Sequence, residues 1–336
     1  IANCIILCLK RYTLVAFCVL QIKTNKMTKK LNSKNSLLGK SASIISVILK
    51  GFGQIMLQEN SITGLLFLIG IFYGSLAMGF AALLATVCGT ATAYLLKYDR
   101  TEIKKGLYGF SAALVGVAVL LFLKPLFWAW IIVGVGSVLA AMLQHFFIKR
   151  KIPAFTFPFV LITWLILFIC NNFYSDLLAI PVPTIAHLSD SLSDGFKSFG
   201  QVIFQNKLVS GLLFFVAVFI SSPIAALYGL AGAIVSDIIA FEFSAPIDNI
   251  NLGLYGFNAV LCAIVFAGNQ VKDGIWAFLS VVLSLGISLL MIKFGLTQLT
   301  FPFVFATWIT LFLKNRLQKP KNAVIFKDRT KPTNSQ

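Results

Sequence analysis

A small set of polar and aromatic residues occurs twice in this chain, in the same order and at nearly the same spacing. Each copy has a glutamine, a threonine, and a Phe/Leu pair four positions apart, which places both apolar side chains on one helix face. Amide and hydroxyl oxygens beside such a face form a slot with apolar walls and a hydrogen-bonding edge. This slot suits a small, flat, uncharged solute. The residues are Gln54, Phe110, Leu114 and Thr156 in the first copy and Gln201, Phe257, Leu261 and Thr300 in the second.

Longer motifs surround these residues and repeat in the same order. Two motifs, Phe-Gly-Gln and Gly-Leu-Tyr-Gly-Phe, return 147 residues later, and a third, Thr-Phe-Pro-Phe-Val, returns 144 residues later. Three matched blocks in one order indicate an internal duplication. The blocks occupy 52–54 and 199–201, 106–110 and 253–257, and 156–160 and 300–304.

The composition places these motifs in a membrane. Of the 336 residues, 58% are hydrophobic and only 12% are charged, with a mean hydropathy of +0.90, whereas soluble domains carry about 25% charged residues. A polytopic membrane protein accommodates this composition, and soluble kinases, nucleases and dehydrogenases are excluded.

The net charge of +17 is concentrated at the two ends of the chain. Residues 1–50 hold nine Lys/Arg and no acid, and residues 314–336 hold seven against Asp328 alone. The positive-inside rule places both termini in the cytoplasm, where they attract anionic membrane lipid. No nucleic acid partner is expected, because no aromatic residues interleave a basic patch.

The apolar runs predict an all-α polytopic membrane protein with about ten transmembrane helices in two inverted five-helix repeats, each with a re-entrant pore helix. We assign the re-entrant elements to 102–122 and 247–268, where glycines interrupt the runs. On this count Lys97 and Lys104 lie outside, against the positive-inside rule, and Lys149 lies inside.

Domain boundaries follow from the same runs. The first methionine is Met27, the expected start, and residues 1–26 are interpreted either as a poor signal-like segment or as non-native upstream translation. The expected parts are a basic N-terminal segment at 1–40, a first membrane repeat at 41–171, an extracytoplasmic linker at 172–187, a second membrane repeat at 188–314 and a basic cytoplasmic tail at 315–336.

Cysteine, histidine and acidic residues give no sign of catalysis. The six cysteines form no CxxC motif, and His145 and His187 lack partners at metal-ligand spacing, so neither metal, cofactor nor enzymatic activity is expected. Asp237 alone lies in an apolar context, and we expect it to snorkel to the interface rather than bind an ion. Without an intramembrane acid for coupling, passive movement is favoured.

Each repeated feature also has a plainer structural interpretation. Either threonine alone is better explained as a helix cap before Phe-Pro, and the Phe/Leu pairs are typical of ordinary packing. Gly64 and Gly211 are expected to be small-residue contacts between helices. Only the joint recurrence of all these features favours a pore.

Over roughly residues 40–315 the motifs resemble the urea transporter family. A duplicated Leu-Pro-x-x-Thr-x-Pro-Phe signature appears at 152–159 and 296–303, with Ile152 in place of Leu and Thr297 in place of the first Pro of the second copy. A further departure is Ser111, which stands where the second copy has Asn258.

The resemblance implies a homotrimer in the cell (inner) membrane, with one pore per protomer through which urea moves in single file down its gradient. It further implies that Gln54 and Gln201 occupy the outer and inner wider sites and that Thr156 and Thr300 form the central constriction. Phe110 with Leu114 and Phe257 with Leu261 then form the hydrophobic slots.

Alternatives remain at this point. An inverted repeat is equally apt for an ion-coupled secondary transporter. A channel for ammonia or small amides is the other rival, although an ammonia channel is expected to have histidines within its pore. An aquaporin is disfavoured because no Asn-Pro-Ala motif occurs.

Overall fold

The computed structural model describes residues 43–180 and 191–317, and within these ranges the chain is helical, with no β-strand. The predicted start Met27, the basic segment 1–40, the tail beyond 317 and part of the linker lie outside the described residues. The chain divides into two units at Val47, and the contacts below belong to the unit that starts at Ile48.

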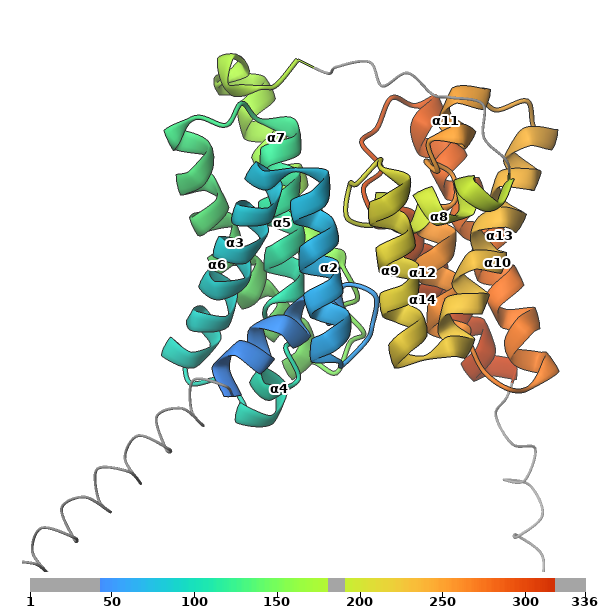
Figure 1. Ribbon diagram of the computed structural model, residues 1–336, viewed down its shortest axis with the longest axis horizontal. Helices are drawn as coiled ribbons and strands as arrows, with labels where there is room; N and C mark the ends of the chain where they lie inside the picture. Colours follow the sequence, from blue (N-terminus) through green and yellow to red (C-terminus); the bar gives the residue numbers. More distant parts are fainter. Residues whose placement is uncertain (1–42, 181–190, 318–336) are drawn as a thin grey trace, which may run out of the picture. The chain divides into compact units, whose positions relative to one another are not determined.

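The helices of the first half differ widely in length, from 5 residues in α4 to 23 in α6. A first helix, Ser43–Gln54, precedes the labelled helices of Figure 1. The helices that follow are α2 (Ser61–Gly74), α3 (Leu76–Leu95), α4 (Arg100–Lys104), α5 (Phe110–Phe122), α6 (Phe127–Lys149) and α7 (Phe157–Phe173), with a 3-10 turn at Ser175–Leu177.

The second half contains helices in the same order and of nearly the same lengths. In both halves the third helix has 20 residues, the helix after the glycine turn is short, and the next has 23. These helices are α8 (Ser191–Gln201), α9 (Leu208–Ser221), α10 (Pro223–Glu242), α11 (Ile247–Asn251), α12 (Phe257–Phe266), α13 (Val271–Lys293) and α14 (Phe301–Leu317).

Among the residues that the structure describes, four helices, α3, α6, α10 and α13, are long and apolar enough to cross a membrane. Together with shorter apolar helices of 10–17 residues, they confirm the predicted fold class of an all-α polytopic membrane protein. Large apolar side chains such as Phe80, Phe168 and Phe278 are exposed on the helices, as a lipid solvent requires.

Backbone angles repeat as closely as the helices do. Positive φ angles occur in the described residues only in pairs, each separated by the 147- or 144-residue offset of the sequence motifs. Seven of these ten residues are not glycine, so the surrounding structure must hold them in a disfavoured conformation. The pairs are Leu57 and Phe204, Lys97 and Ser244, Gly106 and Gly253, Lys151 and Gly295, and Phe155 and Leu299.

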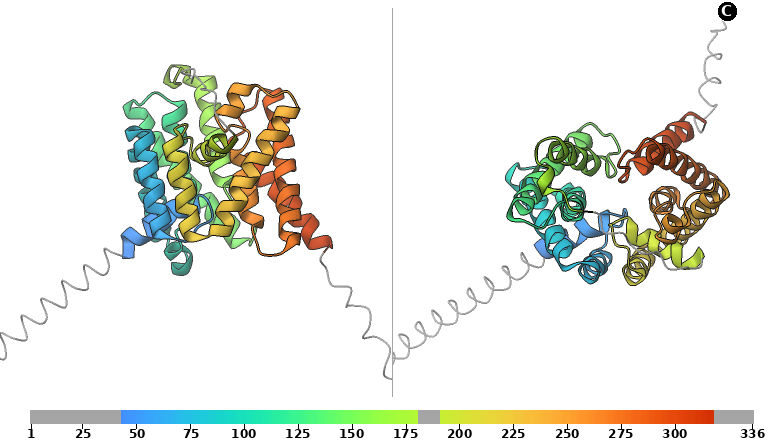
Figure 2. Two further views of the ribbon diagram at one scale, coloured as in Figure 1. Left: turned by 45° about the vertical axis from the view of Figure 1, so that its right-hand side comes forward. Right: turned by 90° about the horizontal axis from the view of Figure 1, so that it is seen from above.

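The two halves meet along two seams, where α2 packs beside α9 and α7 beside α14 (Figure 2). At the first seam, Thr63 Oγ1 donates to the Ala217 carbonyl (2.7 Å) and Ser210 Oγ to the Gly70 carbonyl (2.9 Å). Thr63 and Ser210 are equivalent residues, as are Gly70 and Ala217, so each half makes the same bond to the other.

Contacts at the second seam are reciprocal in the same way. Trp164 Nε1 donates to the Thr297 carbonyl and Trp308 Nε1 to the Pro153 carbonyl, both at 2.8 Å. Again both tryptophans and both acceptors are equivalent pairs, 144 residues apart. Reciprocal bonds of this kind are typical of an interface with two-fold symmetry.

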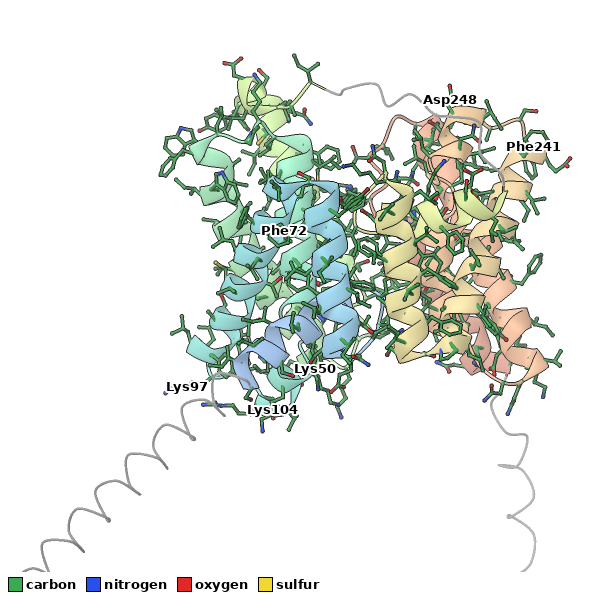
Figure 3. The ribbon with its side chains drawn as sticks, viewed as in Figure 1. Lys50, Phe72, Lys97, Lys104, Phe241 and Asp248 are labelled. Atoms are coloured by element: carbon green, nitrogen blue, oxygen red, sulfur yellow. The ribbon has the colours of Figure 1, made fainter. Side chains whose placement is uncertain are left out.

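Equivalent elements lie at opposite ends of the unit. Helix α4 is at the lower end and its counterpart α11 at the upper end (Figure 1). The labelled side chains near these helices show the same arrangement. Lys50, Lys97 and Lys104 lie at the lower end, and Phe241 and Asp248 lie at the upper end (Figure 3).

One sequence-based assignment is wrong: the segment 102–122 does not return to the end at which it starts. Tyr98, just before α4, stacks on His145 near the end of α6 (3.6 Å between ring centroids), whereas Leu123, just after α5, pairs with Leu178 beyond the far end of α7. Helix α5 therefore runs from one end of the unit to the other. Its glycine turn lies at its start, and the helix itself is an unbroken apolar run, which explains the difference.

This correction changes the expected placement of the basic residues. Because Tyr98 contacts His145, Lys97 lies at the same end as Lys149 rather than at the opposite end. The predicted conflict with the positive-inside rule therefore disappears. In the first half, the helix Ser43–Gln54 is now the candidate re-entrant element, since it is short and adjoins the turn that leads into α2.

Candidate functional site

Each repeated glutamine is held against the repeated glycine turn. Gln54 Nε2 donates to the Lys105 carbonyl and Gln201 Nε2 to the equivalent Leu252 carbonyl, both at 3.0 Å. These bonds use the amide NH2 groups and leave each Oε1 as an acceptor.

The turn approaches the preceding helix so closely that only glycine fits. Gly106 has a φ of +79°, and a Cβ there would lie 2.5 Å from the Gly51 nitrogen. Gly253 repeats this arrangement, with a φ of +74° and a contact of 2.6 Å to the Ser198 nitrogen. Two glycines at these places therefore fix the position of both glutamines.

The repeated threonines of the two halves contact each other. Thr156 Oγ1 and Thr300 Oγ1 lie 2.6 Å apart in a hydrogen bond, and both residues are buried. Thr156 occupies the N-cap position of α7 but its side chain makes no capping bond. The capping interpretation is therefore wrong for this residue, because its hydroxyl pairs with the other half instead.

A small cavity lies on the first-half side of the threonine pair. Its volume is about 130 Å³, and it contains three of the predicted residues, Gln54, Phe110 and Thr156. Phe303 of the second half closes it, with its ring centroid 5.3 Å from that of Phe155. The remaining lining residues are Ile55, Leu57, Leu107, Gln144 and Pro153.

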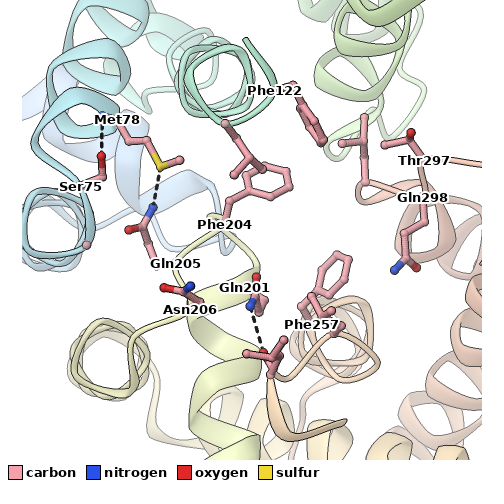
Figure 4. Close-up of a pocket in the computed structure, with 15 residues that line it drawn as sticks. Ser75, Met78, Phe122, Gln201, Phe204, Gln205, Asn206, Phe257, Thr297 and Gln298 are labelled. Atoms are coloured by element: carbon pink, nitrogen blue, oxygen red, sulfur yellow. Dashed lines mark hydrogen bonds between the residues drawn. The ribbon is translucent and has the colours of Figure 1, made fainter. Parts of the chain in front are cut away.

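A second cavity is lined by the equivalent elements of the second half together with residues of the first half, which are Gly74, Ser75, Met78, Leu121 and Phe122. Its volume is about 390 Å³, and it contains the predicted residues Gln201 and Phe257 (Figure 4). Leu299, which directly precedes Thr300, also lines it. Its walls are more polar than those of the first cavity and include Ser75, Gln205, Asn206, Thr297 and Gln298.

Two of the eight predicted residues are placed differently. Leu114 and Leu261 lie one helical turn beyond Phe110 and Phe257, are fully buried, and line neither cavity. The other six line a cavity or, in the case of Thr300, pair with a residue that does.

No charged side chain lines either cavity in the part of the chain that the structure describes. Asp237, expected at the interface, is instead only 4% exposed, and its carboxylate oxygens have no hydrogen-bond partner among the described residues. It lines neither cavity. The snorkelling expectation is wrong because the Asp237 side of α10 faces the protein interior, next to Ser236, which bonds to the Tyr255 carbonyl.

Histidine and cysteine lie away from the cavities as well. The His145 ring contacts Tyr98 and Tyr108, outside both cavities, while His187 lies outside the described residues. Cys170 and Cys262 are buried and free. Among the described residues no cluster of His, Cys, Asp or Glu is able to hold a metal ion.

Several lining residues were not predicted from the sequence. Phe303 belongs to a repeated motif, and its signal was available. Phe155 and Leu299 differ in type between the copies, and what they share is a positive φ, which sequence does not display. Gln144 was missed because it lies in α6, outside every repeated block.

Comparison with known proteins now identifies the family. A family model for urea transporters matches residues 45–315. The chain belongs to the urea transporter family.

Its relatives among known proteins cover most of the chain. Urea transporter 1 of Ovis aries is 28% identical over 298 residues, which cover 80% of this chain and 77% of that protein. Urea transporter 1 of Rattus norvegicus is 30% identical over 239 residues, which cover 66% of this chain and 62% of that protein. This family member is therefore an integral membrane protein that transports urea, and it is a transporter rather than an enzyme.

Proposed function

We propose that the chain is a facilitative urea channel, in which urea passes in single file through the two cavities and past the threonine pair. The observation that carries the proposal is the Thr156–Thr300 hydroxyl pair, which joins a residue of the first cavity to the neighbour of Leu299 in the second, and the described lining of both cavities has no charged side chain. Urea is flat, neutral and rich in N–H donors, and this path offers it oxygens along an apolar slot.

Hydrogen-bond energetics support urea as the permeant. A polar group that leaves water without a new partner costs about 2–7 kcal/mol. The free Oε1 atoms of Gln54 and Gln201 and the threonine hydroxyls supply acceptors along the path. Phe110 and Phe257 line the apolar walls, where an ion has no compensating charge.

The uncharged lining also supports passive movement. Coupling to protons or sodium usually requires an intramembrane acid that faces the solute path. Asp237 is the buried acid of α10, and it lines neither cavity. The ion-coupled alternative is therefore disfavoured.

We further infer that the halves are inverted repeats with both termini on the cytoplasmic side of the cell (inner) membrane. The reciprocal bonds of Thr63 and Ser210 and the opposite positions of α4 and α11 support the inversion. The basic residues at both ends of the sequence support the orientation and an attraction to anionic lipid. Five crossings and one re-entrant helix per half fit these features.

A homotrimer with one pore per protomer belongs to the same proposal and rests on the family resemblance. Chemical cross-linking of the detergent-solubilised protein tests it, with a trimer band expected. A cross-linked ladder that stops at the dimer contradicts it.

Stopped-flow urea flux into proteoliposomes tests the proposed function. We expect fast equilibration that is unchanged by an imposed proton or sodium gradient. Urea accumulation that depends on such a gradient supports the coupled transporter instead. Flux no higher than in empty liposomes, from protein shown to be folded, contradicts urea permeation.

A further inference from the structure

One polar residue of the first cavity, Gln144, is replaced by a different residue type at the equivalent position of the second half. Gln144 lies on α6, is 4% exposed, and lines the first cavity together with Gln54 and Thr156. Its counterpart on α13, 144 residues later, is Ser288, which is 1% exposed and lines neither cavity. Among α6 and its counterpart α13, only α6 therefore places a long amide side chain in the lining of a cavity.

The oxygen of the Gln144 amide is hydrogen-bonded, whereas its NH2 group is available to a solute. Ser111 Oγ donates to Gln144 Oε1 at 3.2 Å. Gln144 Nε2 has no hydrogen-bond partner among the described residues, and it is not among their fully enclosed, unpartnered atoms. Because the side chain lines the cavity, this NH2 group is a donor within reach of a solute there.

In the second half, the backbone beside Thr300 is held without a glutamine at the position equivalent to Gln144. There Asn258 stands in place of Ser111, donates from Nδ2 to the Leu299 carbonyl (3.3 Å) and accepts from the Phe303 nitrogen (3.2 Å). Asn258 thus braces the backbone on both sides of Thr300 by itself. Ser111 bonds to Gln144 instead, so the first half replaces a framework contact with a side chain that lines the cavity.

We propose that Gln144 is an additional substrate-contacting residue, whose Nε2 group donates a hydrogen bond to the carbonyl oxygen of urea or of a related small amide in the first cavity. This inference rests on the proposed function. Gln54 Oε1 accepts from the N–H groups of urea, and one of the two N–H groups of Gln54 is already bonded to the Lys105 carbonyl. Gln144 supplies a further donor for the carbonyl oxygen of the solute, from an NH2 group that has no partner among the described residues.

The proposal predicts a preference among solutes. A carbonyl oxygen accepts hydrogen bonds better than a thiocarbonyl sulfur does, so Gln144 favours urea over thiourea. In a cavity of about 130 Å³ a urea-sized solute has little room to avoid this contact. Loss of the Gln144 donor should therefore reduce urea flux more than thiourea flux.

Three matched variants in proteoliposomes test this role, each compared with wild type for urea and thiourea flux. Gln144→Met keeps the length of the side chain and removes its donors. Ser111→Ala breaks the bond to Oε1 and leaves the NH2 group in place. Ser288→Ala changes the equivalent position of the other half.

We expect Gln144→Met to lower urea flux about threefold to tenfold, the range set by one hydrogen bond at the barrier, and to lower thiourea flux less. Ser111→Ala and Ser288→Ala should stay within about twofold of wild type for both solutes. If Gln144→Met fails to fold, as judged by gel filtration, Gln144→Leu provides the same comparison.

The outcomes separate this inference from the proposed function. Wild-type flux at the level of empty liposomes overturns both. Normal wild-type flux with an unchanged Gln144 variant overturns the role of Gln144 alone. Equal losses in the Gln144 and Ser111 variants, with the urea-to-thiourea ratio unchanged, show that Gln144 only positions the framework and also overturn the proposal.

Discussion

The two cavities share a framework but differ in their walls. Both use a glutamine bonded to a glycine turn and a phenylalanine at the start of the next helix. The second cavity is about three times larger, about 390 Å³ against about 130 Å³, and more of its lining residues are polar. The backbone that frames the two cavities is therefore repeated, while the side chains that line them have diverged.

This difference follows from packing. The glycine turns press against neighbouring backbone, where even a methyl group has no space, so both copies are constrained to the same geometry. Cavity walls face open space and tolerate substitution. Asn206 and Gln298 of the second cavity correspond to Glu59 and Ala154 in the first half, and neither of these lines the first cavity.

A second difference lies in the regions of α4 and α11. In the first half, the Tyr108 hydroxyl contacts Glu102 and His145, whose ring stacks on Tyr98. In the second half, Tyr255 lies in an apolar cluster with Ile250 and Leu285, against which Ala245 and Leu289, the counterparts of Tyr98 and His145, also pack. Polar and aromatic contacts thus pack around Tyr108 in the first half, whereas apolar contacts pack around the equivalent Tyr255 in the second half.

The largest effect is expected where the halves are most alike. We expect Gly106→Val and Gly253→Val to reduce the yield of folded protein to the same extent, because each adds a Cβ about 2.5 Å from backbone at a positive φ. Overpacking alone costs roughly 1–3 kcal/mol. The melting temperature in detergent measures the loss.

Gly134→Ala is the matched control, since nothing lies within 4 Å of the added Cβ. It should leave the melting temperature unchanged. A large loss in only one of the two valine variants breaks the claim that the framework is common to both halves.

An intermediate effect should distinguish the two cavities. We expect Gln54→Leu to lower urea flux about fivefold and Gln201→Leu only about twofold, because a solute in the wider second cavity finds other polar partners when one acceptor is lost. Stopped-flow flux in proteoliposomes provides both values. Equal losses, or a larger loss for Gln201→Leu, indicate that cavity size does not control the barrier.

The smallest effect concerns the caps of α4 and α11. The Asp99 side chain accepts from Thr101 Oγ1 and from the backbone nitrogens of Thr101 and Glu102, and these bonds, chiefly that of the Thr101 side chain, hold the pKa of Asp99 below its usual value. The equivalent α11 has Pro246 at its N-cap position and no side-chain capping bond.

Because the folded-state pKa of Asp99 is lowered, its stabilising effect is present above the unfolded-state pKa and is lost as the pH falls through the folded-state value. Wild type should therefore lose slightly more stability than Asp99→Asn when the pH drops from neutral into that acidic range. Melting curves across this range measure the difference. Identical pH profiles contradict a capping contribution from Asp99.

Much of this architecture could be predicted from the sequence. Apolar runs correctly predict helices and a membrane, and Gly64 and Gly211 are confirmed as close contacts, each beside a backbone carbonyl of the preceding helix. The prediction of a re-entrant element at 102–122 was wrong, because the sequence pattern of a glycine turn before a helix is the same as that of an interruption within one. Asp237 was misplaced because its interior neighbours come from other parts of the chain.

Long-range pairing is what the sequence does not display. Repeated threonines 144 residues apart suggest equivalence, but only the folded chain brings their hydroxyl oxygens to 2.6 Å. The same limit applies to Gln144. Its contact with Ser111 joins two helices, and the residue 144 positions later, Ser288, is of a different type. Positive φ angles at Phe155 and Leu299 depend on this assembled centre as well.

The central claim is that the Thr156–Thr300 pair forms the barrier of a passive urea path, and urea flux through Thr156→Val and Thr300→Val in proteoliposomes tests it most directly. Each variant removes one hydroxyl worth roughly 0.5–1.5 kcal/mol, so flux should fall in both by up to about tenfold, and to a similar extent. Unchanged urea flux in both variants, at normal expression and folding, would contradict the claim.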